Sequence, residues 1–358
     1  MATSVWTTEF THQCAIVPLA DACTQNSQIS YQKCSDAMRL SFLPFPFTQE
    51  ESWYESNPLI PEVFIVRIKD GCLFSNNGYV YSHGLMIKEL LWDWSPLRKQ
   101  PTIHIPPEMN KPERRSVKVA VLAQEGHENY YHWMLEVLPK LALLEKENIS
   151  FDLVYVPYHL PFMQQTLALW GITEDRIIHA GQQHIQANEL IVPSAVSRSC
   201  YTPSWVVNAL RNKYLPFIAS TPNKSFSKKV FISRKKASYR RIENEDEVFN
   251  LFKPYGFKRY FLEDMPFLEQ ISLFHYADAI VAPHGAGLSN ILFCNPETLI
   301  IELFQEHQDE AFWFLGQTVG IQKYICVKTT DFKKGGGYTN TTIPLDTIRT
   351  VISGHLKE

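Results

Sequence analysis

Long apolar stretches and paired cysteine motifs are both missing from this sequence. No run of roughly 18 apolar residues occurs, and the first 25 residues lack a basic start followed by an unbroken apolar segment, so neither a membrane-spanning helix nor a secretory leader is expected. The seven cysteines are scattered and never form Cys-x-x-Cys, which favours a reduced compartment. We therefore predict a cytoplasmic protein that is at most peripheral to the inner face of the membrane.

Several catalytic motifs are absent as well. His127-Glu128 resembles the start of a zinc peptidase motif, but His132 follows His127 at a spacing that puts two rings about 140° apart on a helix. Ser289 lacks the second glycine of an esterase nucleophile turn. No Gly-x-x-x-x-Gly-Lys loop is present, which argues against a nucleoside triphosphatase, and no Asp-x-Asp follows a predicted strand. We therefore expect no metal and no other cofactor.

The overall charge excludes a strong general attraction to polyanions. Thirty-four basic and 37 acidic residues leave a net charge of -3, so no nucleic-acid partner is expected. Apolar residues make up 45% of the 358 positions and charged residues 20%, which is typical of a folded globular protein rather than a disordered one. The length predicts two domains.

The N-terminal half combines irregular and α/β segments. Residues 1–58 include Phe42–Phe47, whose prolines forbid a regular helix, and we assign this region no role. Short β-rich runs between residues 63 and 87 are separated by Asp70-Gly71 and Asn76-Asn77-Gly78, which indicates a small β meander. Further strands and a helix over 129–147 complete an N-terminal α/β domain, predicted over 59–218.

A second α/β domain is predicted over residues 219–358. A polar stretch at 219–227 indicates a linker. Asn244 and Glu247 have the spacing of a capping box and predict a helix start. Short apolar strands separated by helices indicate a doubly wound, Rossmann-like parallel sheet. The expected strands are 230–233, 257–262, 279–282 and 298–303, and the expected helices are 244–252, 266–276 and one that begins at Leu288.

The most informative segment joins an apolar strand to a helix through the turn around Gly285 and Gly287. We expect these glycines to adopt backbone angles closed to other residues and to let a ligand approach the main chain. Unpaired N–H groups around the first helical turn, those of Gly285, Ala286 and Gly287, would face a phosphate or diphosphate, which the helix dipole favours. His284 is expected either to contact this ligand or only to pack.

Two further features support a nucleotide at this turn. Glu302 ends the next strand, where an acid would accept a hydrogen bond from a ribose hydroxyl. Residues 211–241 contain ten basic residues and no acidic one, and Arg234 follows strand 230–233 at the same edge of the sheet. Its guanidinium can hold a phosphate through two parallel hydrogen bonds, and Arg241 is a second candidate.

A second cluster of polar residues lies at the start of helix 129–147. At about 100° per residue, Asn129, His132 and Glu136 share one face, opposite an apolar stripe. The dipole of a helix start disfavours imidazolium, so His132 can act as a neutral base, and Glu136 could orient it. A polar helix face with a structural histidine is the alternative.

The three sequence blocks together resemble glycosyltransferase family 61, which includes bacterial capsular polysaccharide enzymes and eukaryotic transferases of xylose and N-acetylglucosamine. The blocks are Asn129-Tyr-Tyr-His-Trp-Met134, Phe231-Ile-Ser-Arg234 with Arg241 and Asn244-Glu245, and Pro283-His-Gly-Ala-Gly-Leu-Ser-Asn290 with Glu302. The resemblance covers about residues 60–305. It implies a GT-B architecture of two facing Rossmann-like domains, a nucleotide-sugar donor such as a UDP-sugar, inversion at the anomeric carbon and no metal requirement.

The resemblance also implies roles for the candidate residues. The C-terminal domain would bind the donor through Arg234, Arg241 and residues 284–288, with Glu302 on the ribose. The N-terminal domain would bind a glycan acceptor, which could be lipid-linked, near Asn129 and Tyr130. His132, or failing it Glu128 or Glu136, would deprotonate the acceptor hydroxyl. The oligomeric state is not predicted. Alternatives are a non-catalytic nucleotide-sugar-binding regulator, a nucleic-acid binder using the basic stretch, and a dehydrogenase.

Overall fold

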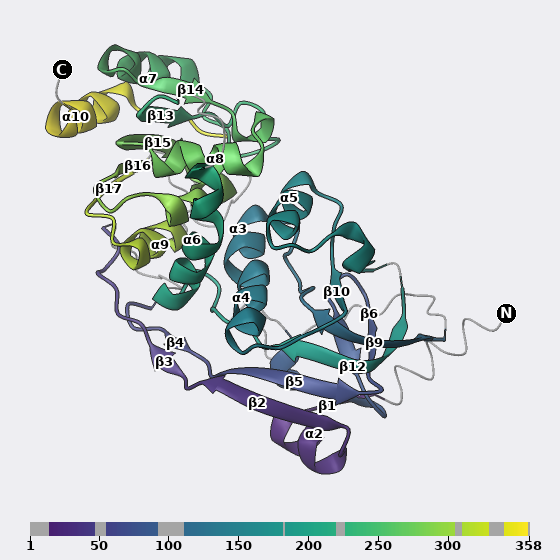
Figure 1. Cartoon of the computed structure of the whole chain (residues 1–358). Coiled ribbons are helices and arrows are strands. Elements are labelled where there is room, and N and C mark those ends of the chain that lie inside the picture. The colour runs from purple at the N-terminus through teal and green to yellow at the C-terminus, as the bar shows by residue number, and fades with distance from the viewer. Residues whose placement is uncertain are drawn as a thin grey trace. The chain divides into compact units, whose positions relative to one another are not determined.

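The computed structural model describes residues 14–46, 55–91, 111–181, 183–219, 226–304, 310–328 and 340–356. The chain divides into two compact units (Figure 1). Unit 1 comprises Met1–Arg39 and Leu59–Ser199, and unit 2 comprises Leu40–Pro58 and Cys200–Glu358. This division differs from the expected boundaries. Residues up to 218 were expected in the first domain, but helix α6 (Ser204–Ala219) belongs to unit 2. It packs against helices α8 and α9, and its Arg211 donates to the carbonyls of Leu292 and Cys294.

Unit 1 contains a mixed sheet of eight strands among the described residues. Its main order is β11-β10-β9-β12-β5-β2, with β6 between β12 and β7. β9, β10, β11 and β12 run parallel, whereas β5 and β2 are antiparallel to their neighbours. The strands are β1 (Ala15–Val17), β2 (Ile29–Ser35), β3 (Met38–Arg39), β4 (Leu59–Ile60), β5 (Val63–Lys69), β6 (Cys72–Phe74), β7 (Tyr79–Tyr81), β8 (Leu85–Ile87), β9 (Glu113–Val121), β10 (Leu153–Val156), β11 (Ile177–His179) and β12 (Ile185–Pro193).

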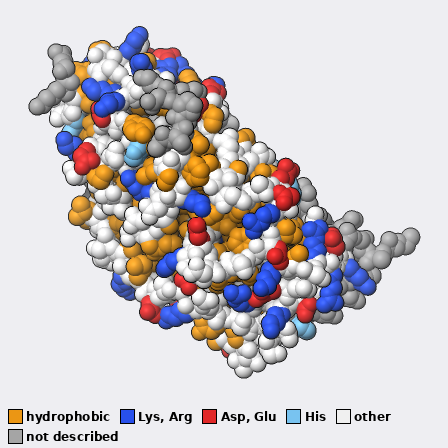
Figure 2. Space-filling view, viewed as in Figure 1, with side chains coloured by type: hydrophobic (Ala, Val, Ile, Leu, Met, Phe, Trp, Pro, Cys, Tyr) orange, Lys and Arg blue, Asp and Glu red, His pale blue; other side chains and the backbone are white. Residues whose placement is uncertain are grey.

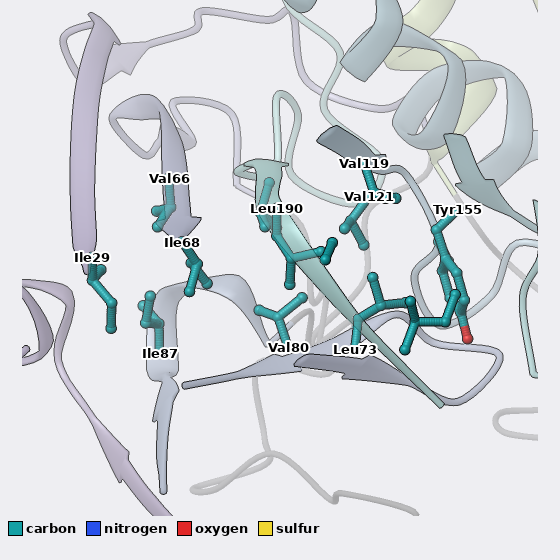
Figure 3. Close-up of a cluster of buried hydrophobic side chains, with 14 of the residues drawn as sticks. Ile29, Val66, Ile68, Leu73, Val80, Ile87, Val119, Val121, Tyr155 and Leu190 are labelled. Carbon is teal, nitrogen blue, oxygen red and sulfur yellow. The ribbon is translucent and has the colours of Figure 1, made fainter. Parts of the chain in front are cut away.

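Apolar side chains two positions apart along these strands build the core of unit 1 (Figure 3). Val119 and Val121 of β9 meet Leu190 of β12 and Val66 and Ile68 of β5 in one buried cluster. The helices of unit 1 are α2 (Leu19–Gln25), η1 (Lys88–Leu90), α3 (Tyr130–His132), η2 (Trp133–Val137), α4 (Leu138–Lys146), α5 (Pro161–Leu169) and η3 (Glu174–Arg176).

Unit 2 is built on a parallel five-stranded sheet with the order β14-β13-β15-β16-β17. The order reverses between β13 and β15, which is where ligands bind in such sheets, outside the carboxyl ends of the strands. The strands are β13 (Lys229–Ile232), β14 (Lys258–Tyr260), β15 (Ala279–Pro283), β16 (Leu299–Leu303) and β17 (Lys323–Val327). The helices besides α6 are α7 (Glu245–Phe252), η4 (Lys253–Tyr255), η5 (Leu262–Asp264), α8 (Phe267–His275), η6 (Ala286–Phe293), α9 (Ala311–Val319) and α10 (Leu345–His355).

Helices cover both faces of this sheet, as Figure 1 shows. α7 and α10 contribute Val248, Phe252 and Ile348 to a core with Phe231 and Ile301 of the strands. The helices α6, α8, α9 and η6 pack against one another. The parallel, doubly covered α/β sheet predicted for the C-terminal half is therefore confirmed.

Several local expectations need correction. The strands between residues 63 and 87 occur as predicted, but only β6 and β7 form an antiparallel hairpin, because β5 pairs with β2 and β12 and β8 pairs in parallel with β1. The predicted helix start at Asn244 is correct, yet its side chain does not cap the helix. Instead, the Asn244 amide exchanges hydrogen bonds with the main chain of Ile343. The predicted linker lies mostly outside the described residues.

Helix length and surface charge can be compared with the expectations from the sequence. In the described part of the chain, every helix is too short or too polar to cross a bilayer. Figure 2 shows Lys and Arg side chains interspersed with Asp and Glu over the visible face of the described residues. All seven cysteines carry free thiols in the structure.

Candidate active site

Strand β13 leads directly to the first candidate site, in unit 2. The chain leaves the strand at Ser233 and Arg234, next to the reversal of strand order, and two groups fix this turn. The carboxylate of Glu245, which is fully buried at the start of α7, accepts hydrogen bonds from the Ser233 hydroxyl at 2.6 Å and from the Arg234 N–H at 3.0 Å. Glu245 therefore anchors the segment that carries the arginine.

The Arg234 side chain lies against the glycine turn that follows β15. Its Nε and Nη2 donate to the carbonyls of Arg240 and Tyr239, each at 3.2 Å. A Cβ added to Gly285 would overlap Nη1 of Arg234 and come within 2.9 Å of its Cζ. Nη1 therefore faces the main chain of the turn, and only a residue without a side chain leaves room for it.

This close approach explains Gly285 better than the backbone angles that we expected. Gly285 has a φ of 165°, which is extended backbone open to any residue, and neither it nor Gly287 is among the positive-φ glycines of the described residues. At Gly287 a Cβ would meet Cδ1 of Leu262 at 2.6 Å. The two glycines therefore do not use the backbone angles that only glycine can take. The close neighbour that the structure shows at Gly285 is Arg234, and the approach of a ligand to this turn stays a prediction.

Helix η6 begins at this turn, two residues earlier than predicted. The N–H groups of Gly285, Ala286 and Gly287 make no hydrogen bond within the described residues, whereas Leu288 donates to the carbonyl of Gly285 at 2.9 Å. The Leu288 side chain is buried. The three amides that we expected to face an anion, those of Gly285, Ala286 and Gly287, thus have no hydrogen-bond acceptor within the described residues.

The charge of Arg234 is not neutralised by a close carboxylate. Among the described residues, no Asp or Glu oxygen lies within ion-pair distance of its guanidinium. Burial, followed by the neighbouring Arg240 guanidinium, lowers the pKa of Arg234. Arginine still stays protonated in proteins, so this group is a partly buried cation beside three N–H donors. Such an arrangement favours a phosphate or diphosphate.

His284 and Glu302 form a closed pair behind the turn. Glu302 is 0% exposed, and its two oxygens lie 2.6 Å from Nδ1 of His284 and 2.6 Å from the hydroxyl of Tyr324. Burial, and then the Glu302 charge, raises the pKa of Tyr324 well above 10, so its hydroxyl donates. This geometry corrects the ribose contact expected of Glu302, because a sealed carboxylate with two partners offers no surface to a ligand. Its role here is to orient His284.

Arg241 stands apart from this arrangement. Its side chain is exposed, and its main-chain N–H and carbonyl are bonded to the Asn340 side chain and the Thr341 N–H. Within the described residues no contact links it to the glycine turn. The second arginine candidate is therefore not joined to the first.

The second candidate site lies in unit 1, on the helix that follows β9. Asn129 caps this helix by accepting a hydrogen bond from the Tyr131 N–H at 2.9 Å. Residues Trp133–Val137 form a π-helical turn, whose wider spacing shifts the following residues away from the 3.6-residue pattern. This shift explains why Glu136, which we expected on the exposed face, is only 4% exposed.

The predicted pairing of His132 with Glu136 is present. Nδ1 of His132 lies 3.0 Å from Oε1 of Glu136, which is ion-pair distance without hydrogen-bond alignment. The other oxygen of Glu136 accepts from the Gln124 amide at 3.0 Å. The His132 side chain is 20% exposed, with its ring against Gly126. Because Nδ1 faces the carboxylate, Nε2 is the nitrogen that can meet a ligand proton.

A buried lysine completes this cluster. Lys140 is 6% exposed and donates to the carbonyl of Leu122 at 3.3 Å. Burial lowers its pKa to about 8, and the Glu136 carboxylate opposes this shift. Lys140 thus places a buried amino group, whose pKa is lowered, near the Glu136 carboxylate.

The remaining candidates near His132 have other surroundings. Glu128 is 68% exposed and lies 3.3 Å from Nε2 of His159. Tyr130 packs edge-on against Phe162. His127 is buried with Nδ1 2.6 Å from the Gln124 carbonyl, and burial lowers its pKa. In the part of the chain that the structure describes, no three His, Cys, Asp or Glu residues group as metal ligands.

Four supporting residues were not predicted as part of either site. Glu245 lies in the second sequence block, at the start of the helix that follows Arg234. An acidic residue at that position was a signal that could have identified it. Gln124, Lys140 and Tyr324 gave no signal, because their roles depend on β9, a π-helical turn and β17 meeting other elements.

A parallel α/β sheet with a cation and main-chain N–H groups at its strand ends is an arrangement typical of proteins that bind phosphorylated ligands. Comparison with known proteins identifies the family. Residues 130–301 match the family model described as Glycosyltransferase 61, which confirms the family that the three sequence blocks indicated.

Curated relatives belong to the same class. The chain is 29% identical over 98 residues to the EGF domain-specific O-linked N-acetylglucosamine transferase of Mus musculus, and 28% identical over 98 and 95 residues to those of Gallus gallus and Drosophila melanogaster. Each match covers 26% of this chain and 18–19% of the relative. The chain therefore spans about a fifth of the length of these relatives.

Proposed function

We propose that this protein is a glycosyltransferase that moves a sugar from a nucleotide-diphosphate donor to a hydroxyl of a glycan acceptor. A UDP-sugar is the proposed donor. Inversion at the anomeric carbon, independence of metal ions and a GT-B architecture are parts of the proposal, on the strength of the family. The relatives' names make N-acetylglucosamine the first sugar to test.

One observation carries the donor assignment: the guanidinium of Arg234 faces Gly285, where three main-chain N–H groups begin helix η6. A diphosphate would accept hydrogen bonds from both, and charge-assisted hydrogen bonds each contribute about 1.5–3 kcal/mol. As the sugar leaves, negative charge grows on the diphosphate. Donors that are already in place stabilise that charge without reorganisation.

His132 is the proposed base. The acceptor oxygen forms a bond to the anomeric carbon while its proton passes to Nε2 of His132. The bond from the anomeric carbon to the diphosphate oxygen breaks, and its electron pair stays on the diphosphate. Glu136 faces Nδ1 and stabilises the imidazolium that forms. Glu128 is a weaker candidate because it is exposed and lies 3.3 Å from Nε2 of His159.

The pathway and the cellular location also belong to the proposal. Capsular or exopolysaccharide synthesis, a lipid-linked acceptor and a cytoplasmic location follow from the family and from the unpaired cysteines. Asn129 and Tyr130 remain the proposed acceptor-side residues, and Arg241 a secondary donor contact.

Calorimetric titration with UDP tests the donor assignment. We expect wild-type protein to bind UDP and Arg234→Ala to bind it about 10–100-fold more weakly, because one or two charge-assisted hydrogen bonds are lost. Lys228→Ala is the matched control, since it removes a cation that is 74% exposed from the opposite end of β13. Equal affinity of wild type and Arg234→Ala would overturn the assignment, and loss of binding in both variants would point to general charge.

Gly285→Ala tests the same site without removing a charge. The added methyl group must displace the Arg234 guanidinium, although the backbone angle tolerates alanine. We expect about tenfold weaker UDP binding, since the displaced group keeps its charge but loses its alignment. Gly354→Ala, where the methyl group meets no atom within 4 Å, should bind like wild type. Unchanged affinity of Gly285→Ala would show that this alignment does not matter.

A further inference from the structure

An N-terminal segment far from the donor site in sequence is part of unit 2. Residues 40–46 run beside helix α9 (Figure 1). The main chain of Leu43 is held on both sides, because its carbonyl accepts from Nε1 of Trp313 and Nε2 of Gln317 at 3.2 Å each, and its N–H donates to Oε1 of Gln317 at 2.6 Å. The Leu43 side chain is 68% exposed. The segment is thus fixed by its backbone.

This attachment places one aromatic ring between two others. The Phe45 ring lies edge-on to Phe304, with centroids 5.5 Å apart, and edge-on to Trp313, with centroids 6.0 Å apart. Phe304 follows β16, and Trp313 belongs to α9. Phe45 therefore contacts two elements of unit 2: the end of β16, the strand that carries the buried Glu302, and helix α9.

Both neighbours of Phe45 support a hydrogen-bond partner of Glu302. Phe304 stacks on His284 at 5.4 Å, and Trp313 lies edge-on to Tyr324 at 5.4 Å. His284 and Tyr324 are the groups that reach the two Glu302 oxygens at 2.6 Å. Edge-to-face and offset ring pairs have preferred geometries and add to the stabilisation from burial, so the rings restrict where these partners can lie.

We propose that Phe45 is a positioning residue for the donor site. Through Phe304 and Trp313 it holds His284, and His284 directly precedes Gly285, whose N–H and whose fit to Arg234 define the diphosphate cradle. The donor part of this inference rests on the proposed function; the effect on His284 does not. Residues 40–46 would then set donor affinity rather than take part in the chemistry.

Hydrogen–deuterium exchange on the full chain tests the effect on the turn. In Phe45→Ala we expect at least about tenfold faster exchange of the hydrogen-bonded amides within His284–Phe293, such as those of His284 and Leu288, because the ring support of His284 is lost. Exchange in Glu245–Phe252 on the other face of the sheet should stay unchanged, which separates local loosening from general destabilisation. Phe45→Tyr, which keeps the ring, and Leu43→Ala, which alters an exposed side chain, should both match wild type.

Calorimetry and turnover then test the donor part. Phe45→Ala should bind UDP about tenfold more weakly, while turnover at saturating donor stays within about twofold of wild type. Phe45→Leu, which keeps an apolar side chain without the ring, should show the same local effect at smaller size, and it replaces Phe45→Ala if that variant does not fold.

Each result has a separate meaning for the two proposals. Unchanged exchange at His284–Phe293, or equal acceleration there and in Glu245–Phe252, overturns the positioning role of Phe45. Local acceleration in a protein whose wild type does not bind UDP supports the positioning role and overturns the donor function. Local acceleration with unchanged UDP affinity overturns the link from Phe45 to donor binding.

Discussion

The candidate site of each unit includes a histidine–glutamate pair, His132–Glu136 in unit 1 and His284–Glu302 in unit 2, and the two pairs differ in how closed they are. In unit 1, His132 lies 3.0 Å from Glu136 and is 20% exposed. In unit 2, His284 lies 2.6 Å from Glu302, is 2% exposed, and is covered by the rings of Phe304 and Phe312. The same two side chains thus form a partly exposed pair in unit 1, where we propose proton transfer, and an enclosed pair in unit 2, where we propose support of the donor turn.

The geometry of each pair follows from its secondary structure. His132 and Glu136 are four residues apart on one helix, so their contact is local and the π-helical turn adjusts it. His284 and Glu302 lie at the ends of neighbouring parallel strands, so their contact depends on the register of β15 with β16. We therefore expect changes in the first pair to alter turnover and changes in the second to alter stability and donor binding.

The largest expected effect is on turnover in His132→Ala. Loss of a general base lowers kcat by about 10²–10⁴-fold, whereas UDP affinity should stay within about twofold because the residue lies in the other unit from the donor site. Single-turnover sugar transfer and UDP calorimetry measure the two quantities. A His132→Ala variant with wild-type kcat would remove this residue from the base role.

The two carboxylates should separate stability from activity. Glu302→Gln leaves either His284 or Tyr324 facing an amide N–H₂, so we expect the free energy of unfolding of unit 2 to fall by about 1–3 kcal/mol. Glu136→Gln should lower kcat by about tenfold through weaker stabilisation of the imidazolium, with a smaller loss of stability. Urea unfolding and turnover of both variants provide the comparison. The reverse pattern, with Glu302→Gln inactive but stable, would assign the chemistry to the buried pair.

The sequence predicted a pair well where its contacts join residues close together in the chain, and poorly where they join distant residues. His132–Glu136 followed from helical periodicity, because both residues lie within two turns. The partners of Glu302 did not, because Tyr324 lies 22 residues further along and reaches it only through pairing of β16 with β17. Strand positions and parallel order in unit 2 were predictable from short apolar runs. The sequence placed Arg234 and the glycine turn at the same edge of the sheet. It did not predict where η6 begins or that the Arg234 guanidinium packs directly against Gly285.

Lys140, which packs behind the first pair, links the stability of unit 1 to pH. Burial lowers its pKa to about 8, below the ordinary value of 10.5, so the unfolded chain binds more protons than the folded one between these values. This residue therefore makes stability rise as pH increases from about 8 to about 10.5. In Lys140→Met that rise should be absent, and stability at pH 7 should be unchanged or higher. Parallel unfolding curves for both proteins from pH 7 to 10 would contradict the assigned burial cost.

The donor site in unit 2 is tested most directly by NMR titration of ¹⁵N-labelled full-length protein with UDP. If the diphosphate binds at the start of η6, the amide resonances of Gly285, Ala286 and Gly287 and the guanidinium signal of Arg234 shift first and most strongly, and Arg234→Ala suppresses these shifts. Shifts confined to other parts of the chain, or equal shifts in Arg234→Ala, would contradict a diphosphate cradle at this turn.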